Sequence, residues 1–187
     1  MVAIVRATDK DCKMNYQFRK ALRSEIPAIW MILQQAIKRR KEEGSSQWQD
    51  GYPNPEMIKK DIQKEAGYVL TEAETIVGYC AVLINDEPQY EKIIGKWLSN
   101  EDYVVVHRVA IAEGQTGKGL ALKLMAFIET YARNKNIYSI KADTNFDNPA
   151  MKHIFDKLGY HFCGEVYFRG EPREAYEKIL SKPGQMV

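Results

Sequence analysis

The sequence predicts a mixed α/β fold in one domain, with helices on both faces of a mixed, mostly antiparallel sheet. Segments of two-residue apolar alternation and segments of helical spacing follow in the order β-α-α-β-β-β-α-β-α-β-β. Short connections in the middle of the chain are typical of hairpins, whereas one strand–helix–strand succession requires a crossover. The 187 residues suffice for one domain with a full core.

The first half of the chain is predicted to contain one strand, two helices and a hairpin. Polar and apolar residues alternate over 16–20, which indicates a short strand. Helical spacing follows over 24–43 and again over 54–66, and a glycine comes directly after each of these segments. Strands are predicted over 68–72 and 75–84, and the few residues between them favour a hairpin.

The second half has the most apolar strand of the chain, followed by a helix that is apolar on most faces and therefore largely buried. A further helix has an apolar stripe at positions i, i+4 and i+8 and ends at a glycine. The predicted elements are strand 103–111, helix 119–134, strand 137–142, helix 149–158 and strands 160–168 and 174–180.

The N-terminal segment is polar and has no regular pattern before Met14. We therefore expect a domain over residues 14–187, preceded by an extension over 1–13 that need not be ordered. No apolar stretch approaches the ~20 residues of a membrane helix.

Charge and cysteine usage narrow the classes of partner. Lys and Arg number 27 against 25 Asp and Glu, a net charge of +2, so the basic excess typical of nucleic-acid binding is missing. The three cysteines are widely spaced without a CxxC pair, which favours reduced thiols over a zinc site. We expect a cytoplasmic protein with no nucleic-acid, membrane or metal partner, and a homodimer is left open.

A turn with two glycines joins the central strand to the long helix. Backbone N–H groups around Gly117 and Gly119, with the positive end of the helix dipole, form a site for an anion. A P-loop is excluded, because Ala112 stands in place of its first glycine and no hydroxyl residue follows the lysine. A dinucleotide site lacks its third glycine at Leu122, although Asp143 could contact a ribose. A purely structural turn is the simplest alternative.

The segment 107–121 resembles the central motif of the GNAT acetyltransferases, Arg/Gln-x-x-Gly-x-Gly/Ala at the start of a helix. Gly117, Gly119 and Ala121 match the small residues of this motif. Thr116 stands in place of the usual Arg or Gln, which removes a side-chain contact to pyrophosphate but none of the backbone donors.

The segment 148–160 resembles the second motif of the same family, an Asn-x-x-Ala…Tyr-x-Lys-x-Gly-Phe helix. Both motifs stand at the family's spacing, and the resemblance covers roughly residues 15–180. It implies the GNAT fold, with a sheet splayed open at the acetyl-CoA site between the strands that end near Ile111 and Ala142.

The resemblance also implies which residues bind acetyl-CoA, the expected cosubstrate. The central strand would pair with the pantetheine arm, the turn would bind the pyrophosphate, and Asn148 would meet the pantetheine or the thioester end. A helix N-cap is a second role for Asn148, compatible with the first. The expected cofactor-binding residues are Val109, Ala110, Ile111, Thr116, Gly117, Lys118, Gly119, Leu120, Ala121 and Asn148.

Direct attack by a primary amine needs a proton acceptor, because a lysine-like amine has a pKa near ~10. Family members carry Glu or His as the base at the position of His107, and imidazole has an unperturbed pKa of ~6.5. A sheet histidine without a catalytic role is the alternative. Arg108 is expected to point the other way and to be structural. The residues that alternation places on one face of the strand are Tyr103, Val105, His107, Val109 and Ile111.

The chain departs from the family at Phe155, where many members have a tyrosine that protonates the leaving thiolate. Either Tyr103, Tyr160 or Tyr167 replaces this group, or the thiolate leaves without enzymatic protonation. Two functions therefore stay open. One is an N-acetyltransferase that acts on a small-molecule, amino-acid or peptide amine, and the other is a non-catalytic acyl-CoA-binding or sensing module.

The polar loop between the first two helices carries two aromatic residues without periodic partners, Trp48 and Tyr52. Aromatic side chains in a loop favour recognition, and family members place their acceptor-binding wall at this point. Trp48 and Tyr52 are therefore expected to bind the substrate. A loop held over the core by Trp48 is the alternative.

Overall fold

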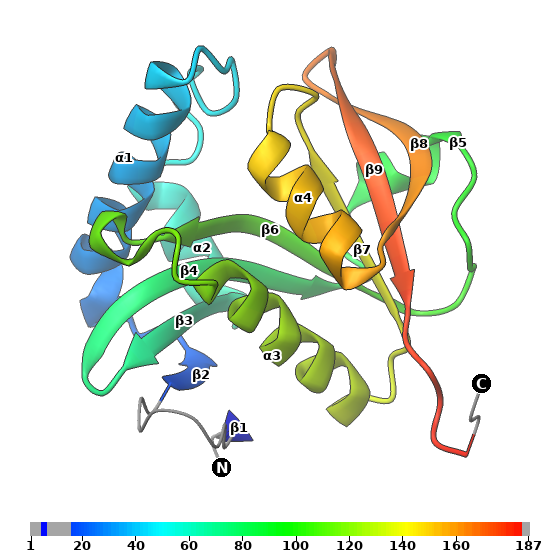
Figure 1. Cartoon of the computed structure of the whole chain (residues 1–187), viewed down its shortest axis with the longest axis horizontal. Helices are drawn as coiled ribbons and strands as arrows, with labels where there is room; N and C mark the ends of the chain where they lie inside the picture. Colours follow the sequence, from blue (N-terminus) through cyan, green and yellow to red (C-terminus); the bar gives the residue numbers. More distant parts are fainter. Residues whose placement is uncertain (1–4, 7–15, 185–187) are drawn as a thin grey trace. The chain divides into compact units, whose positions relative to one another are not determined.

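The computed structural model describes residues 5–6 and 16–184. The expected extension over 1–13 lies outside the described residues, apart from a two-residue strand, β1 (Val5–Arg6), which pairs with the next strand. The polypeptide forms two compact units, and Figure 1 labels the elements of each. Unit 1 comprises Met1–Ala81 and Arg108–Phe127, and unit 2 comprises Val82–His107 and Ile128–Val187.

Unit 1 has a sheet in which β1, β2, β3 and β4 pair antiparallel in chain order, with β6 next to β4. Strands β4 and β6 and helix α3 continue into unit 2. The elements of unit 1 after β1 are β2 (Tyr16–Lys20), η1 (Arg23–Glu25), α1 (Ile26–Glu42), α2 (Pro55–Gln63), β3 (Gly67–Glu72), β4 (Thr75–Ile84), β6 (Tyr103–Ile111), η3 (Glu113–Gln115) and α3 (Leu120–Asn134).

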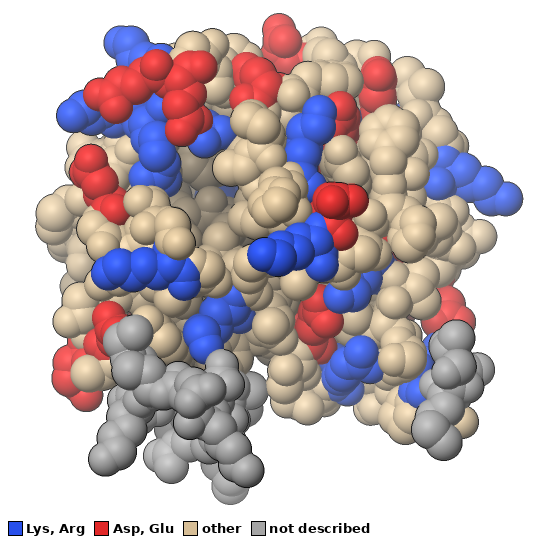
Figure 2. Space-filling view, viewed as in Figure 1, with Lys and Arg blue, Asp and Glu red and all other residues tan. Residues whose placement is uncertain are grey.

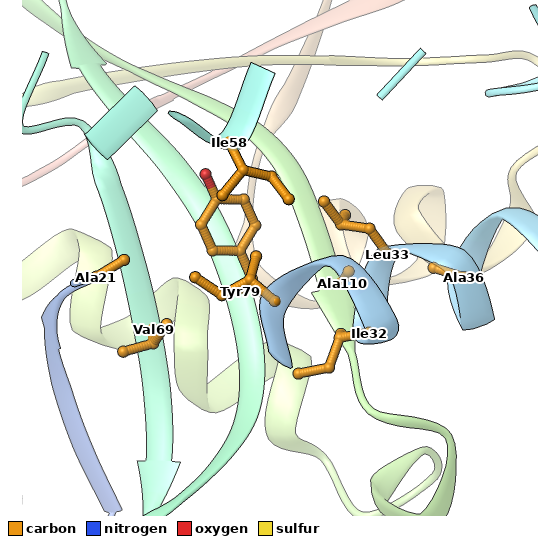
Figure 3. Close-up of a cluster of buried hydrophobic side chains, with 9 residues drawn as sticks. Ala21, Ile32, Leu33, Ala36, Ile58, Val69, Tyr79 and Ala110 are labelled. Atoms are coloured by element: carbon orange, nitrogen blue, oxygen red, sulfur yellow. The ribbon is translucent and has the colours of Figure 1, made fainter. Parts of the chain in front are cut away.

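The core of unit 1 forms where the apolar stripe of α1 packs on the sheet and on α2 (Figure 3). The residues of this stripe recur at i, i+3, i+4 and i+7 and therefore share one helix face. Tyr79 of β4 is fully buried among them. The buried residues of this cluster are Ala21, Ile29, Ile32, Leu33, Ala36, Ile58, Val69, Tyr79 and Ala110.

A buried ion pair joins α2 to β6 within unit 1. Arg108 donates from Nη2 to Asp61 Oδ1 at 2.6 Å and from Nε to Oδ2 at 2.9 Å. The same carboxylate accepts a 2.7 Å hydrogen bond from the Tyr79 hydroxyl. Burial alone would lower the pKa of Arg108, but Tyr52 and Asp61 hold it above its ordinary value. The guanidinium therefore stays charged inside the unit.

The alternation of side chains along β6 is broken at Arg108, whose φ of 57° lies in the left-handed region. Arg108 contacts Asp61 of α2 and Ala110 packs in the cluster with α1, whereas Ile111 lies near Gly78 beside Leu124 of α3. The expectation that one face runs unbroken from Tyr103 to Ile111 is wrong across this position, because simple alternation assumes extended backbone throughout.

Unit 2 has strands in the order β6-β7-β9-β8-β5. The pair β6–β7 is parallel, and the others are antiparallel. The parallel register runs from Tyr103 with Ser139 to Val106 with Ala142 and stops there, although both strands continue. The remaining elements are η2 (Pro88–Lys92), β5 (Ile94–Gly95), β7 (Ser139–Thr144), α4 (Pro149–Leu158), β8 (His161–Phe168) and β9 (Glu171–Ile179).

The predicted elements are confirmed, with shifts at a few ends that have local causes. Strand β7 begins later than predicted, because Ile137 N–H still donates to Ala132 at the end of α3. Strand β9 begins earlier, because Arg169 and Gly170 both have positive φ and form the tight turn of a hairpin.

The segment before β6 has no regular alternation of apolar residues. Contacts with side chains, rather than pairing between strands, hold most of this segment in place. The carboxylate of Glu177, which is fully buried, accepts from the N–H of Leu98 at 2.6 Å and from the hydroxyls of Ser99 and Ser139 at 2.8 and 2.6 Å. Lys141 Nζ lies 4.5 Å from the ring centroid of Trp97. Such contacts leave no periodicity in the sequence.

We expect Asp61→Asn to destabilise the protein by about 3–5 kcal/mol, because it leaves the Arg108 charge buried without its counter-ion. Urea unfolding measures the change. Glu56→Gln on the same helix is the control, since its pair with Lys59 is exposed and contributes less than about 1 kcal/mol. Equal free energies of unfolding for the two variants would contradict a stabilising role for the buried pair of Asp61 and Arg108.

Strands β5 and β8 approach each other closely at Gly95 and Gly164, which have φ of 141° and 137°. A Cβ on Gly164 would overlap the carbonyl oxygen of Ile94. We expect Gly164→Ala to cost about 2 kcal/mol or more in urea unfolding, because the clash is with backbone. Gly114→Ala, where nothing lies within 4 Å of the added methyl group, should change little. A Gly164→Ala midpoint equal to that of the wild type would refute the close approach.

Candidate active site

The glycine turn of unit 1 ends at the first residue of α3 and exposes its backbone. Gly117 and Gly119 have φ of 78° and 74°, a conformation that side-chain-bearing residues adopt only with strain, and a Cβ on either would meet nothing within 4 Å. The first hydrogen bond of the helix runs from Lys123 N–H to Gly119 O at 3.0 Å. The N–H groups before Lys123 in the first turn of the helix therefore have no helical acceptor.

The polar side chains of the turn bind to the turn itself. The Thr116 hydroxyl donates to Glu113 O at 2.9 Å, and Lys118 Nζ donates to Gln115 Oε1 at 3.0 Å. Exposed backbone donors, the helix dipole and one ammonium group fit a diphosphate without a contribution from Thr116. Leu120 is buried and holds the helix start against the unit, while Ala121 is half-buried.

The end of β6 supplies the other predicted cofactor residues of unit 1. Ala110 and Ile111 are buried and Val109 is half-buried. Ala112 N–H donates to Val77 O at 3.0 Å, so the strand stays attached to β4 up to its end. On its other edge, β6 has no registered strand beyond Val106 among the described residues.

His107 lies in unit 2 within a cluster of charged side chains. Its Nε2 is 2.8 Å from Glu87 Oε2, and its Nδ1 is 3.7 Å from Asp143 Oδ1. Asp143 also accepts from the Tyr90 hydroxyl at 2.8 Å and from Arg173 Nη1 at 3.2 Å. The Asp143 side chain is thus bound through both oxygens and only 1% exposed, which weakens the interpretation of Asp143 as a ribose-binding residue.

Sequence analysis missed Glu87, Tyr90 and Arg173 as members of the His107 cluster. They come from the loop before η2, from η2 itself and from β9. Their spacing along the chain follows no motif, and the only available signal was a run of acidic and aromatic residues without strand pattern.

Asn148 of unit 2 is buried and caps α4. Its Oδ1 accepts a 3.1 Å hydrogen bond from Met151 N–H. This geometry supports the expected N-cap role, and the contact with pantetheine stays a prediction.

The two aromatic residues of the α1–α2 loop, in unit 1, both contact the interior. Trp48 packs against the core cluster, and Arg108 Nη1 donates to the Tyr52 hydroxyl at 2.5 Å. These contacts support the alternative in which the loop is held over the core. A role in substrate binding stays a prediction for both residues.

The phenols that could replace a tyrosine at Phe155 differ in surroundings. Phe155 is buried, with ring centroids 5.1 Å from Tyr160 and 4.7 Å from Tyr176. Burial raises the pKa of Tyr160, whose hydroxyl has no hydrogen-bond partner in the described part of the chain. Tyr167 donates to Glu165 at 3.1 Å, and the Tyr103 ring lies 4.0 Å from Lys141 Nζ.

The face shown in Figure 2 carries Lys and Arg side chains interleaved with Asp and Glu. Within residues 5–6 and 16–184, no helix has the length and apolar character needed to cross a membrane. The same residues contain no group of three or more His, Cys, Asp or Glu side chains arranged to bind a metal ion.

Comparison with known structures identifies chains of the same fold. An acetyltransferase of the GNAT family from Streptococcus agalactiae is 36% identical, covers 89% of this chain and 96% of its own, and superposes with a TM-score of 0.82. YncA, a putative acetyltransferase from Salmonella typhimurium solved with its cofactor acetyl-CoA, is 16% identical over 91% of this chain and 96% of its own, with a TM-score of 0.62.

The curated relative YesJ, an uncharacterized N-acetyltransferase from Bacillus subtilis, is 20% identical over 146 residues, which are 77% of this chain and 81% of YesJ. The family model of the Acetyltransferase (GNAT) family matches residues 31–160, well over half of the chain. This chain therefore belongs to the GNAT family of acetyltransferases and is an acyltransferase.

Proposed function

We propose that this protein transfers an acetyl group from acetyl-CoA to a primary amine by direct attack in a ternary complex. The observation that carries the proposal is the half-buried His107, whose ring is 2.8 Å from the Glu87 carboxylate and 3.7 Å from Asp143. An imidazole held in this way on the central strand suits the transfer of a proton from an amine.

The cosubstrate would supply an acetyl group activated as a thioester. Its diphosphate would be held by the backbone donors of the turn from Thr116 to Ala121, with Lys118 adding a positive charge. The backbone of Val109, Ala110 and Ile111 and the side chain of Asn148 are the proposed contacts for the pantetheine arm. The acetyl-CoA bound to YncA of Salmonella typhimurium supports this choice of cosubstrate.

His107 would take the proton that the amine must lose before it can attack. We propose no tyrosine as the proton donor to the leaving group, because a CoA thiol is acidic enough to leave as the thiolate. The acceptor is proposed to be the amine of a small molecule, an amino acid or a peptide. Trp48 and Tyr52 are proposed to border the acceptor through the parts of their rings that core packing leaves exposed.

A second candidate function is acyl-CoA binding without catalysis. Phe155 favours it, because a buried phenylalanine cannot protonate a thiolate. Both candidates predict the same ligand on the glycine turn, so they differ only in turnover.

We expect acetyl-CoA and CoA to raise the melting temperature, and NAD and ATP to leave it unchanged, in a thermal-shift experiment. A ligand at 100 times its Kd adds about 2.7 kcal/mol of stability. Gly119→Val should abolish the shift, because a β-branched residue is strained at a φ of 74°. Gly114→Ala serves as the control. Stabilisation by NAD but not by CoA would overturn the proposal.

Thiol release over a panel of amines separates catalysis from binding. We expect turnover with at least one primary amine and a loss of about 10²–10⁴-fold in His107→Gln, because the proton acceptor is removed. His161→Gln, which changes an exposed histidine of β8, is the matched control. Full turnover of His107→Gln at neutral pH would exclude His107 from the mechanism, and acetyl-CoA binding without release for any amine would favour the second candidate.

A further inference from the structure

The neighbours of His107 decide which of its ring nitrogens carries the hydrogen. Nε2 lies 2.8 Å from Glu87 Oε2, a hydrogen-bond distance, whereas Nδ1 lies 3.7 Å from Asp143 Oδ1, beyond one. A carboxylate only accepts hydrogen bonds. In the neutral imidazole the hydrogen must therefore be on Nε2, and the lone pair is on Nδ1.

Glu87 is itself held in place. It is the N-cap of η2, and its Oε1 accepts from the N–H of Gln89 at 3.3 Å. Its side chain is 14% exposed, close to the 12% of His107. One carboxylate oxygen is thus bound to the backbone of η2, and the other is directed at His107 Nε2.

Asp143 is held by two donors and cannot turn freely toward the imidazole. The Tyr90 hydroxyl donates to Oδ1 at 2.8 Å and Arg173 Nη1 donates to Oδ2 at 3.2 Å. Burial, then the charge of Asp143, raises the pKa of Tyr90, so this hydroxyl stays protonated and keeps donating. A negative charge is therefore fixed near Nδ1 without occupying its lone pair.

We infer that Glu87 is a positioning residue that holds His107 as the Nε2–H tautomer, so that Nδ1 is the atom that receives the proton of the acceptor amine. An N–H bond of the protonated amine breaks, its electron pair stays on the amine nitrogen, and a new N–H bond forms at Nδ1. The positive charge moves to an imidazolium between Glu87 and Asp143. This assignment rests on the proposed function, because it needs His107 as the base.

The groups that face His107 come from four elements of unit 2 and include two further aromatic rings. Phe168 of β8 presents its ring edge-on at 6.3 Å between centroids, and Tyr90 lies at the same distance. The charged or titratable groups are Glu87 before η2, Tyr90 of η2, Asp143 of β7 and Arg173 of β9.

The tautomer can be measured without knowing the acceptor. Long-range ¹H–¹⁵N NMR of the imidazole rings distinguishes Nε2–H from Nδ1–H, and His107→Gln identifies the signals of His107 among the three histidines. We expect Nε2–H in the wild type above the pH at which the ring is protonated, and Nδ1–H or a mixture in Glu87→Gln. Nδ1–H in the wild type would overturn the inference.

The kinetic test uses the amine found in the panel. Glu87→Gln should lower kcat/KM at neutral pH by about 10²-fold or more, shift the acidic limb of the pH profile, and leave the melting temperature unchanged. Glu87→Asp should recover part of the activity, because it restores a carboxylate, which only accepts, whereas the amide of glutamine can also donate. Glu101→Gln, which changes an exposed carboxylate of the same unit, should match the wild type.

Failure of the proposed function and failure of the role assigned to Glu87 give different results. If His107→Gln keeps full turnover, the proposed function of His107 is wrong, and this inference is lost with it. If His107→Gln is inactive while Glu87→Gln keeps the wild-type rate and pH profile, only the role of Glu87 is overturned. If Glu87→Gln is too unstable for kinetics, the tautomer of His107 measured by NMR in the wild-type protein still tests the inference.

Discussion

The break in β6 at Arg108 is the constraint on which the rest of the structure depends. A positive φ in the middle of a strand costs free energy, and the buried ion pair with Asp61 holds it in place. The same carboxylate binds Tyr79, so α2, β4 and β6 are attached to one another at a single buried group. The chain passes from unit 2 to unit 1 at this residue. The side chains before Arg108 therefore pack within unit 2, and those after it pack within unit 1.

Two buried carboxylates of unit 2, Glu177 and Asp143, likewise accept hydrogen bonds from several donors. Glu177 receives backbone and hydroxyl hydrogens and orders a segment that has almost no regular structure. Asp143 receives the hydroxyl of Tyr90 and the guanidinium of Arg173. Because Asp143 accepts from Tyr90 and Arg173 and lies 3.7 Å from His107 Nδ1, that ring nitrogen keeps the lone pair that the proposed role of His107 as a proton acceptor needs.

Membership of the GNAT family and the geometry within each unit support the same proposed chemistry independently. The turn before α3 offers backbone donors and a helix dipole to an anion, with no contribution required from the side chain of Thr116. The cluster around His107 supports the proposal that this histidine is the proton acceptor. The substitution at Phe155 changes only the proposed departure of the thiolate, for which a weakly basic leaving group needs no donor.

Much of the fold could be predicted from the sequence, because it depends on local signals. Periodicity located the helices and strands, glycines marked the turn before α3, and Asn148 was identified as a helix cap. The positive φ of Arg108 and the partnership of His107 with Glu87 have no local signal. They arise where residues far apart in the chain meet, and only the free energy of burying charges together decides such contacts. The sequence by itself thus determined the fold class and the position of the glycine turn before α3, whereas the tertiary structure decided the surroundings of the histidine.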